Sequence, residues 1–273
     1  GARLLSEGAH YGYNGSEQIS GSLLPNTIGK LIIAAKSAVT LSKAVTVSDA
    51  VEMIEGALVL AGNALTYGPK ASLIYSGTSE QTTSEAEFPQ TNGPNALLIT
   101  NSKRAVLHAS RSVDSLYVAC RFDIGDNVLT VGSAMNSNER AFVVMSEAGA
   151  LRIRDVGPSE AFFPVGITAF APVWVKNSGE ADAVRVHVVR DTGKAANGGR
   201  VNLLWTVTED VAGGGDYSLK FGWMNSFEDA TFRSNRDRDA RIFFMADTTE
   251  RGSGGYDYHF DAQPFWLARS GYQ

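Results

Sequence analysis

Short apolar couplets at period two recur along the chain from residue 31 to residue 68. They are Leu31/Ile33, Val39/Leu41, Val45/Val47, Val51/Met53, Leu58/Leu60 and Leu65/Tyr67. Residues two apart on a strand point to the same face, so each couplet predicts a short strand with one buried face. The residues between the couplets are rich in Gly, Asn, Ser, Ala and Asp, which suits tight connections.

The couplets also repeat at a longer period. A shift of about twenty residues along the chain brings each couplet onto another one, and residues of one couplet are then equivalent to those of the next. The pairs so related are Leu31/Ile33 with Val51/Met53, Val39/Leu41 with Leu58/Leu60, and Val45/Val47 with Leu65/Tyr67. A chain that returns to the same side in this way stacks its strands in parallel rungs, so the pattern predicts a β-solenoid with these apolar side chains inside.

The whole stretch occurs a second time. Leu97 and Ile99 match Leu31 and Ile33, and the segment 127–132 (NVLTVG) matches 63–68 (NALTYG). Each copy follows a similar lead-in, Tyr13-Asn14-Gly15 with Leu24-Pro25 and Tyr75-Ser76-Gly77 with Phe88-Pro89. The long repeat is therefore about 64 residues, or three rungs.

After residue 156 the strands become longer and the aromatic residues more frequent. Alternating strands are predicted at Ala183–Val189, at 203–207 and at 217–223, and two final strands at Tyr256–Phe260 and Pro264–Ala268. The sequence thus predicts an all-β protein: a right-handed parallel β-solenoid of about six to seven short rungs, followed by an antiparallel β-sandwich of the Ig-like kind. Residues 1–156 form the solenoid, with an open N-terminal rung, and residues 157–273 the sandwich.

Helix signals are almost absent from the sequence. The run Arg233–Arg241 (RSNRDRDAR) mixes charges of both signs, which favours a solvated, salt-bridged hairpin edge. The polar stretches Ser76–Pro94 and Ser133–Arg140 are predicted to be loops that project from one side of the stack.

The lead-in Tyr13-Asn14-Gly15, the couplets that follow it, and the later segment Phe163-Pro164-Val165-Gly166 form a recognisable order. This order resembles the repeat-rich secreted surface proteins of Bacteroidota-type bacteria, over roughly residues 11–245. The resemblance implies a secreted, extracellular or cell-surface protein of the adhesin or fibre type. It brings no catalytic residues with it.

Composition narrows the choice of partners. The chain has 273 residues, 44% of them hydrophobic, and a net charge of -5. No basic stripe suggests nucleic acid or anionic lipid, and no apolar run reaches the roughly 18 residues that membrane insertion needs. Cys120 is the single cysteine, which excludes an internal disulfide and a zinc–thiolate cluster. No leader-like segment is present, so we expect a mature or trimmed form.

A basic cluster is the strongest candidate for catalysis. Lys103, Arg104, His108 and Arg111 lie within one rung of the second copy, and a solenoid polysaccharide-cleaving enzyme would use such bases and cations in a groove. A solvated basic patch explains them more simply, because no acidic metal cage accompanies the cluster. The four histidines, His10, His108, His187 and His259, form no ligand pair.

Acidic pairs are weak candidates for calcium binding. Glu180/Asp182, Glu228/Asp229 and Asp237/Asp239 carry the hard oxygen ligands that Ca²⁺ prefers, but no known loop spacing supports a site. We therefore predict no cofactor, with calcium as the weaker alternative.

Aromatic and N-terminal residues suggest contacts with partners. Trp205 and Trp223 alternate with aliphatic residues and are expected in the sandwich core, whereas Trp174 lies in a strand with two apolar faces, one of which is predicted to be exposed. An exposed face of this kind marks a glycan platform or a subunit contact. The apolar side chains before the first full rung are also predicted to contact a neighbouring subunit: Leu4, Leu5, Tyr11 and Tyr13.

These observations favour a structural function. We expect a subunit of a cell-surface fibre or filament, not an enzyme, in which copies join head to tail by β-strand contacts and residues 1–13 complete a sheet of the neighbour. A glycan- or surface-binding adhesin module is the alternative, and a polysaccharide-cleaving solenoid enzyme is the least favoured.

Overall fold

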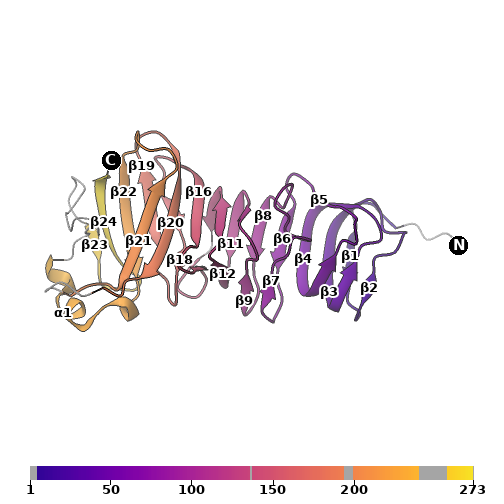
Figure 1. Ribbon diagram of the computed structural model, residues 1–273, viewed down its shortest axis with the longest axis horizontal. Coiled ribbons are helices and arrows are strands. Elements are labelled where there is room, and N and C mark those ends of the chain that lie inside the picture. Colours follow the sequence, from indigo (N-terminus) through magenta and orange to yellow (C-terminus); the bar gives the residue numbers. More distant parts are fainter. Residues whose placement is uncertain (1–4, 136, 194–198, 240–256, 273) are drawn as a thin grey trace.

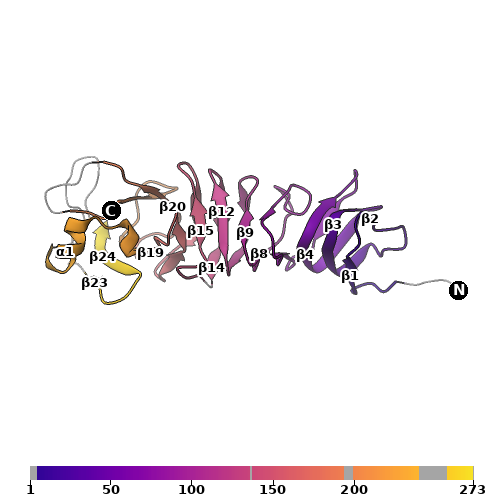
Figure 2. The same ribbon diagram turned by 90° about the horizontal axis from the view of Figure 1, so that it is seen from below.

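The computed structural model describes residues 5–135, 137–193, 199–239 and 257–272. The molecule is elongated, and its strands are stacked along the long axis, with the N-terminus at one end and the C-terminal strands at the other (Figures 1 and 2). The N-terminal part is a parallel β-solenoid of about eight turns, and antiparallel sheets follow it. The predicted fold class is confirmed, with slightly more turns than the sequence indicated.

The longest sheet of the solenoid runs through seven parallel strands. In spatial order they are β1 (His10–Tyr13), β3 (Thr27–Thr40), β4 (Val45–Val59), β6 (Ser72–Tyr75), β8 (Ala96–Ile99), β11 (Ser115–Val118) and β14 (Ser133–Met135). Two short strands pair with the ends of the long strands: β2 (Gln18–Ile19) with the end of β3, and β5 (Leu65–Tyr67) with the start of β4.

Two further sheets complete the rungs. One contains β7 (Gln81–Thr82), β9 (Arg104–Val106), β12 (Arg121–Gly125), β15 (Val143–Met145) and β18 (Val165–Gly166), all parallel. The other contains β10 (Arg111–Ser112), β13 (Val128–Val131), β16 (Ala150–Val156), β20 (Asp182–Arg190) and β21 (Leu203–Glu209). In this sheet β16 is parallel to β13 and antiparallel to β20, so one strand joins the solenoid to the sandwich.

Strand register confirms the repeat of about twenty residues. Leu31 pairs with Val51, Val39 with Leu58, and Val45 with Leu65, as the couplets predict. The predicted inward residues Leu31, Ile33, Val39, Leu41, Val51, Met53 and Leu58 are all buried. Leu60 is the exception, because it lies just past the end of β4 and is only half-buried.

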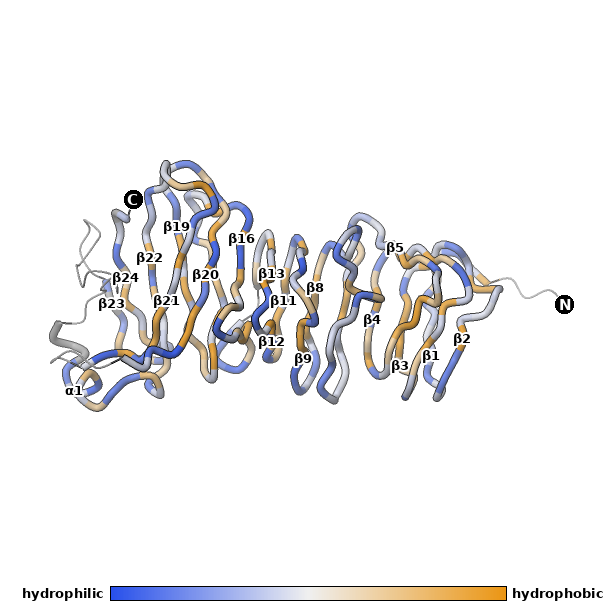
Figure 3. Tube along the Cα trace, viewed as in Figure 1, coloured by the Kyte–Doolittle hydropathy of each residue, from blue (hydrophilic) through white to orange (hydrophobic). Residues whose placement is uncertain are grey.

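The sandwich is completed by a five-stranded antiparallel sheet. Its order is β17 (Ala161–Phe163), β19 (Val173–Asn177), β22 (Tyr217–Trp223), β24 (Phe265–Tyr272) and β23 (Asp257–His259). One face of this sheet packs on β20 and β21: the half-buried Trp205 ring lies 5.3 Å from that of Phe221 and donates a hydrogen bond to the carbonyl of Ala171. Trp223 is buried in the same core. Apolar residues recur along the strands of both parts (Figure 3).

Three local predictions are wrong. The Ser76–Pro94 stretch is not a projecting loop, because it contains β7 and buries Thr83, Glu87 and Phe88 in the stack. The Ser133–Arg140 stretch begins with a strand, β14. The predicted hairpin edge at Arg233–Arg241 is instead largely helix α1 (Ala230–Asp239), after a short 3₁₀ turn at Asn225–Phe227.

Helix α1 forms where an acidic residue caps its start. The Asp229 carboxylate accepts hydrogen bonds from the amides of Phe232 and Arg200 at 2.7 and 2.8 Å, which satisfies one of the free amides in the first turn. Phe232 packs edge-on against Trp223, with ring centres 6.1 Å apart. The cap and this aromatic contact hold a helix in which Phe232 is the one large apolar side chain.

Candidate binding surface on the β-sandwich

The outer face of the five-stranded sheet carries a row of side chains, one from each strand. In spatial order they are Phe162, Trp174, Lys220, Trp266 and His259, which we call the aromatic row. Phe162 pairs with Trp174, and Trp174 with Lys220, in direct cross-strand register. His259 pairs with Trp266, and Trp266 lies diagonally from Lys220 because its own partner is Gly222.

Neighbouring members of the row are in contact. The Phe162 and Trp174 rings stack with centres 5.3 Å apart. The Lys220 ammonium lies 4.4 Å from the centre of the Trp174 ring and 5.4 Å from that of Trp266, close enough for cation–π attraction to both. His259 stacks on Trp266 at 5.9 Å. Four spacings of about 4.8 Å make the row roughly 19 Å long.

All five side chains are half-buried, and their strand neighbours point the other way. Val173 and Val175 on either side of Trp174 are buried, as are Leu219 and Phe221 beside Lys220. This alternation places the row on the outer face, as period two requires. Trp174 itself lies outside the core, but Phe170 and Pro172, which alternate with it, are buried, so the predicted exposed apolar face is limited to the half-buried Trp174.

A glycine allows the Trp174 ring to lie flat over the sheet. A Cβ atom on Gly222 would lie 3.1 Å from Cζ3 of Trp174 and 2.8 Å from Cγ of Pro172, both tighter than ordinary contacts. The absence of a side chain on β22 at this point is therefore what lets the indole cover the main chain. An aromatic ring over a strand glycine is a known way to shield an exposed backbone.

Polar groups border the row on one side. The Lys220 ammonium also forms an ion pair with Glu160 at 3.1 Å. Glu160 and Phe162 line a cleft of about 450 Å³ at the junction with the solenoid, together with Asp155, Gly157 and Pro158. The row therefore offers flat apolar faces with a cation in the middle and carboxylates at one end.

The structure divides the predicted basic cluster into separate contacts. Arg104 pairs with Glu80 at 3.1 Å and Asp123 at 3.4 Å, and Lys103 is exposed. Arg111 is buried instead and donates a hydrogen bond to the carbonyl of Phe88. These cations do not converge on one groove.

His108 and Arg111 do come together, beside Thr83 and Glu85. A guanidinium only donates, so the Arg111 contact of 2.6 Å to Nε2 of His108 leaves the imidazole proton on Nδ1. Nδ1 then donates to Thr83 Oγ1 at 2.5 Å. Burial and the nearby Arg111 charge hold the pKa of His108 below its usual value. The folded state thus disfavours the charged imidazole, and in this tautomer Nδ1 donates to Thr83 and does not accept from it.

A buried carboxylate, which the sequence analysis missed, lies next to this cluster. Glu87 accepts hydrogen bonds from the Tyr75 hydroxyl at 2.6 Å and from the amide and hydroxyl of Ser84, while its carbonyl accepts one from the Tyr67 hydroxyl. Burial and the Glu87 charge raise the pKa of both tyrosines. This site is missed because the stretch Ser76–Pro94 is mostly polar and is therefore predicted to be an exposed loop.

The acidic pairs serve the fold. Glu228 accepts a hydrogen bond from Trp223 Nε1 at 2.9 Å, Asp229 caps α1, and Asp182 accepts from the amide of Val211 at 2.8 Å. In the described part of the chain no three His, Cys, Asp or Glu residues are grouped to hold a metal ion. The side chains of Asp237 and Asp239 lie outside the described residues, and calcium binding stays a prediction.

The predicted N-terminal contact residues have different surroundings. Tyr11 and Tyr13 lie in β1, which pairs with β3 of the same chain, and both pack on the solenoid core. Leu5 is 42% exposed, and Leu4 lies outside the described residues. Strand β1 therefore pairs on one edge within its own sheet, and Tyr11 and Tyr13 contact the core of their own chain.

Comparisons with protein-family models, with curated proteins and with solved structures find no match to this chain. The resemblance to secreted surface proteins therefore stays a prediction. Across the described ranges, no helix is both long and apolar enough to span a membrane.

Proposed function

We propose that this protein is a cell-surface adhesin that binds glycans through the aromatic row. The row itself carries this proposal: it is a half-exposed strip of three aromatic rings, a histidine and a lysine that crosses a whole sheet. Flat aromatic faces pack against the C–H faces of sugar rings, and the flanking ammonium and carboxylates exchange hydrogen bonds with hydroxyl groups. A length of roughly 19 Å fits an extended chain of several sugars better than a single sugar.

The solenoid supports this function mechanically. Its strands stack along the long axis and set the sandwich at the end opposite the N-terminus (Figure 1). A stack of rungs held by continuous main-chain hydrogen bonds is a stiff spacer. An extracellular, secreted location follows from the proposal, as does a binding mechanism without cofactor or bond cleavage.

The test uses variants of the row and a panel of soluble neutral and uronic-acid polysaccharides in affinity electrophoresis. We expect the protein to be retarded by at least one polysaccharide, and Trp174→Ala and Trp266→Ala each to weaken that binding about tenfold, since each removes a stacking face. Tyr11→Ala is the matched control, because Tyr11 is a half-buried aromatic in β1, at the opposite end of the molecule from the row (Figure 1). Retention of full binding by both tryptophan variants would contradict the proposal, as would an absence of any retardation.

A fibre subunit is the second candidate, and the first rung favours it. Among the described residues, β1 and β2 each pair with β3 and have no strand on their outer side. Apolar side chains gather at this end, with Ile19 69% and Leu23 63% exposed. Open strand edges with exposed apolar residues are prone to pair with another chain, and contact between different surfaces of identical copies produces a filament.

Electron microscopy with light scattering tests the fibre. We expect Ile19→Lys combined with Leu23→Lys to keep the protein monomeric, and Ile54→Lys, at a 37% exposed position within the stack, to leave assembly unchanged. Filaments of equal width and length from the double variant would exclude the first rung as the contact.

A further inference from the structure

One strand is missing from the side of the solenoid where β5 and β10 lie. Each rung contributes a strand to this side in turn: β4 begins there, β5 pairs with that part of β4, and β10, β13 and β16 continue it farther along. The rung between β5 and β10 supplies β6 and β7 to the other two sides. Its third segment, residues 83–95, contains no strand.

The chemistry of residues 83–95 explains the gap. Pro89 and Pro94 have no amide proton to donate to a ladder, and Asn92 has a left-handed φ of 54°. The carbonyls of Glu87 and Phe88 accept hydrogen bonds from the Tyr67 hydroxyl and from Arg111 Nε, not from a neighbouring strand. The segment therefore fills the interior but leaves the edges of the flanking strands open.

Both edges present main-chain groups to the gap. The amide of Gly68 and the carbonyl of Ala64 bond to β4, so the alternate residues Leu65 and Tyr67 direct their amides and carbonyls away from it. On the other side the amide of Val113 bonds to Thr130, so that of Ser112 points away from β13. Within the described chain, β5 pairs with β4 alone and β10 with β13 alone.

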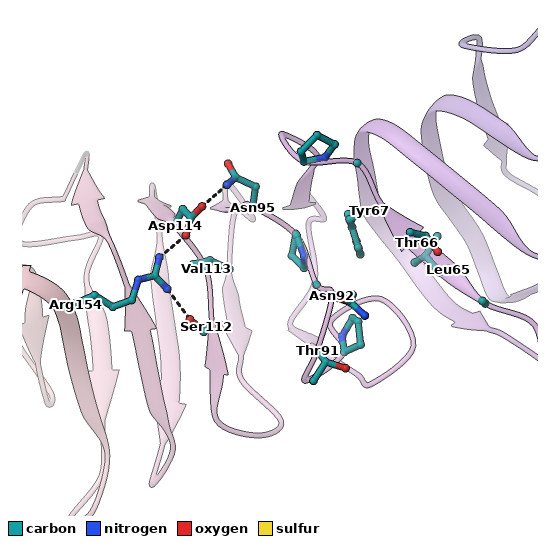
Figure 4. Close-up of a pocket in the computed structure, with 16 residues that line it drawn as sticks. Leu65, Thr66, Tyr67, Thr91, Asn92, Asn95, Ser112, Val113, Asp114 and Arg154 are labelled. Atoms are coloured by element: carbon teal, nitrogen blue, oxygen red, sulfur yellow. Dashed lines mark hydrogen bonds and ion pairs between the residues drawn. The ribbon is translucent and has the colours of Figure 1, made fainter. Parts of the chain in front are cut away.

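A cleft of about 600 Å³ lies between these edges, and we call it the strand slot. Figure 4 shows Leu65, Thr66 and Tyr67 on one side and Ser112 and Val113 on the other, with Asn92 between them. Its rim is polar: Asp114 accepts hydrogen bonds from Asn95 and Arg154 (Figure 4). Phe88 does not line the slot but is fully buried behind the lining residue Gly93, where a Cβ would lie 3.8 Å from the Phe88 ring.

We propose that the strand slot binds an extended segment of a partner polypeptide, which completes the missing strand. Two facing edges with free amides and carbonyls match a peptide main chain, which carries a donor and an acceptor at every residue, better than they match a sugar chain. Phe88 and Arg111 are buried and already occupy the interior next to the slot. We therefore expect the bound peptide to alternate small residues, which face inward, with residues that face solvent.

The partner is a different protein and not a second copy. The strands of the described chain already pair in sheets of their own, so a second copy has no spare strand to donate from there. The slot is on the side of the solenoid and is separate from the aromatic row, so this inference does not depend on glycan binding.

The free protein provides the first test, by amide hydrogen exchange followed by NMR. We expect the amides of Leu65, Tyr67 and Ser112 to exchange much faster than those of Gly68 and Val113, their hydrogen-bonded neighbours. Protection of Ser112 equal to that of Val113 in the free protein would show that the slot is closed and would overturn the proposal.

The second test screens a library of labelled hexapeptides that alternate Thr or Val with Gly, Ala or Ser, using fluorescence anisotropy. We expect a subset to bind saturably and to protect the same three amides. Ser112→Pro removes one donor at an edge position and should weaken binding roughly tenfold, whereas Lys103→Ala, at an exposed position outside the slot, should bind as the wild type does.

Three results would overturn this assignment. They are an absence of binding by every peptide, equal binding by Ser112→Pro when its circular dichroism spectrum is native, and protection of the three amides by oligosaccharides. A concentration-dependent dimer that Ser112→Pro dissociates would identify the occupant as a second copy instead. Failure here and failure of the glycan proposal are distinguishable, because Trp174→Ala should leave peptide binding unchanged.

Discussion

Arg111 Nε donates a hydrogen bond of 2.6 Å to the carbonyl of Phe88, and this contact ties β10 to the excursion that precedes β8. The guanidinium also bonds to the carbonyl of Ser110 and to the Glu85 carboxylate, and its side chain is only 4% exposed. One buried cation thus holds together two segments that lie 23 residues apart.

Removal of this cation should weaken the fold. Arg111→Met keeps the length of the side chain but leaves the Phe88 carbonyl without its donor, so we expect the free energy of unfolding to fall by about 2 kcal/mol. Urea denaturation followed by circular dichroism measures this. Glu85→Gln is the control and should change stability little, because Glu85 is exposed. An unchanged urea midpoint in Arg111→Met would show that the hydrogen bonds of Arg111 do not contribute to stability.

The difference in burial between Leu41 and Leu60 leads to a second prediction. Leu41 is 1% exposed and points into the stack, so Leu41→Asp places an unpaired charge in an apolar interior and should prevent folding. Leu60 is half-buried, and Leu60→Asp should leave the protein folded with a lower melting temperature. Thermal melts of both variants decide this, and similar melting temperatures would contradict it.

Stability should depend on the protonation of His108. Its pKa is lowered by burial and by the Arg111 charge, against the opposing effect of Glu85 and Glu87, so the folded state favours the neutral imidazole. This contribution is complete above the unfolded pKa of about 6.5 and is lost as the pH falls below it. We expect the urea midpoint to fall between about pH 7 and pH 5, and less steeply in His108→Gln. Identical pH profiles for the two proteins would rule out this role.

Gly222 allows a test of the geometry of the aromatic row that leaves all its members in place. Gly222→Ala adds a methyl group against Trp174 and Pro172, so we expect the indole to tilt and glycan affinity to fall several-fold. Gly12→Ala in β1 is the control, because the nearest atom to its added Cβ is 3.9 Å away and the site is remote from the row. Tryptophan fluorescence reports the tilt, and an unchanged spectrum with unchanged affinity would show that the ring has room to adapt.

The repeating core could be predicted from the sequence, because a parallel stack sets the same demand at every rung. Leu31 and Val51 must both be apolar since they lie side by side in register, and that demand appears directly as a period. The alternation around Trp174 likewise indicated that its side chain lies outside the core. In both cases the information is local to one strand or to one rung.

The rest depends on contacts between segments whose pairing the sequence does not show. Phe162 and His259 join one row because of the order in which five strands assemble, and no motif marks Lys220 or Trp266 as members. Glu87 lies in a polar stretch, yet its burial follows from hydroxyl groups on strands β5 and β6. Helix α1 depends on the cap at Asp229, which looks like one acidic residue among many.

Strand β16 bonds to β13 of the solenoid on one edge and to β20 of the sandwich on the other. Loss of β16 would therefore expose an open edge in both parts at once, so these neighbours should unfold as one cooperative unit. At the strand slot the rungs are coupled more weakly, because one of the three hydrogen-bond ladders between successive rungs is missing there. We therefore expect native-state hydrogen exchange to show two units that open independently, with the boundary between them at the slot.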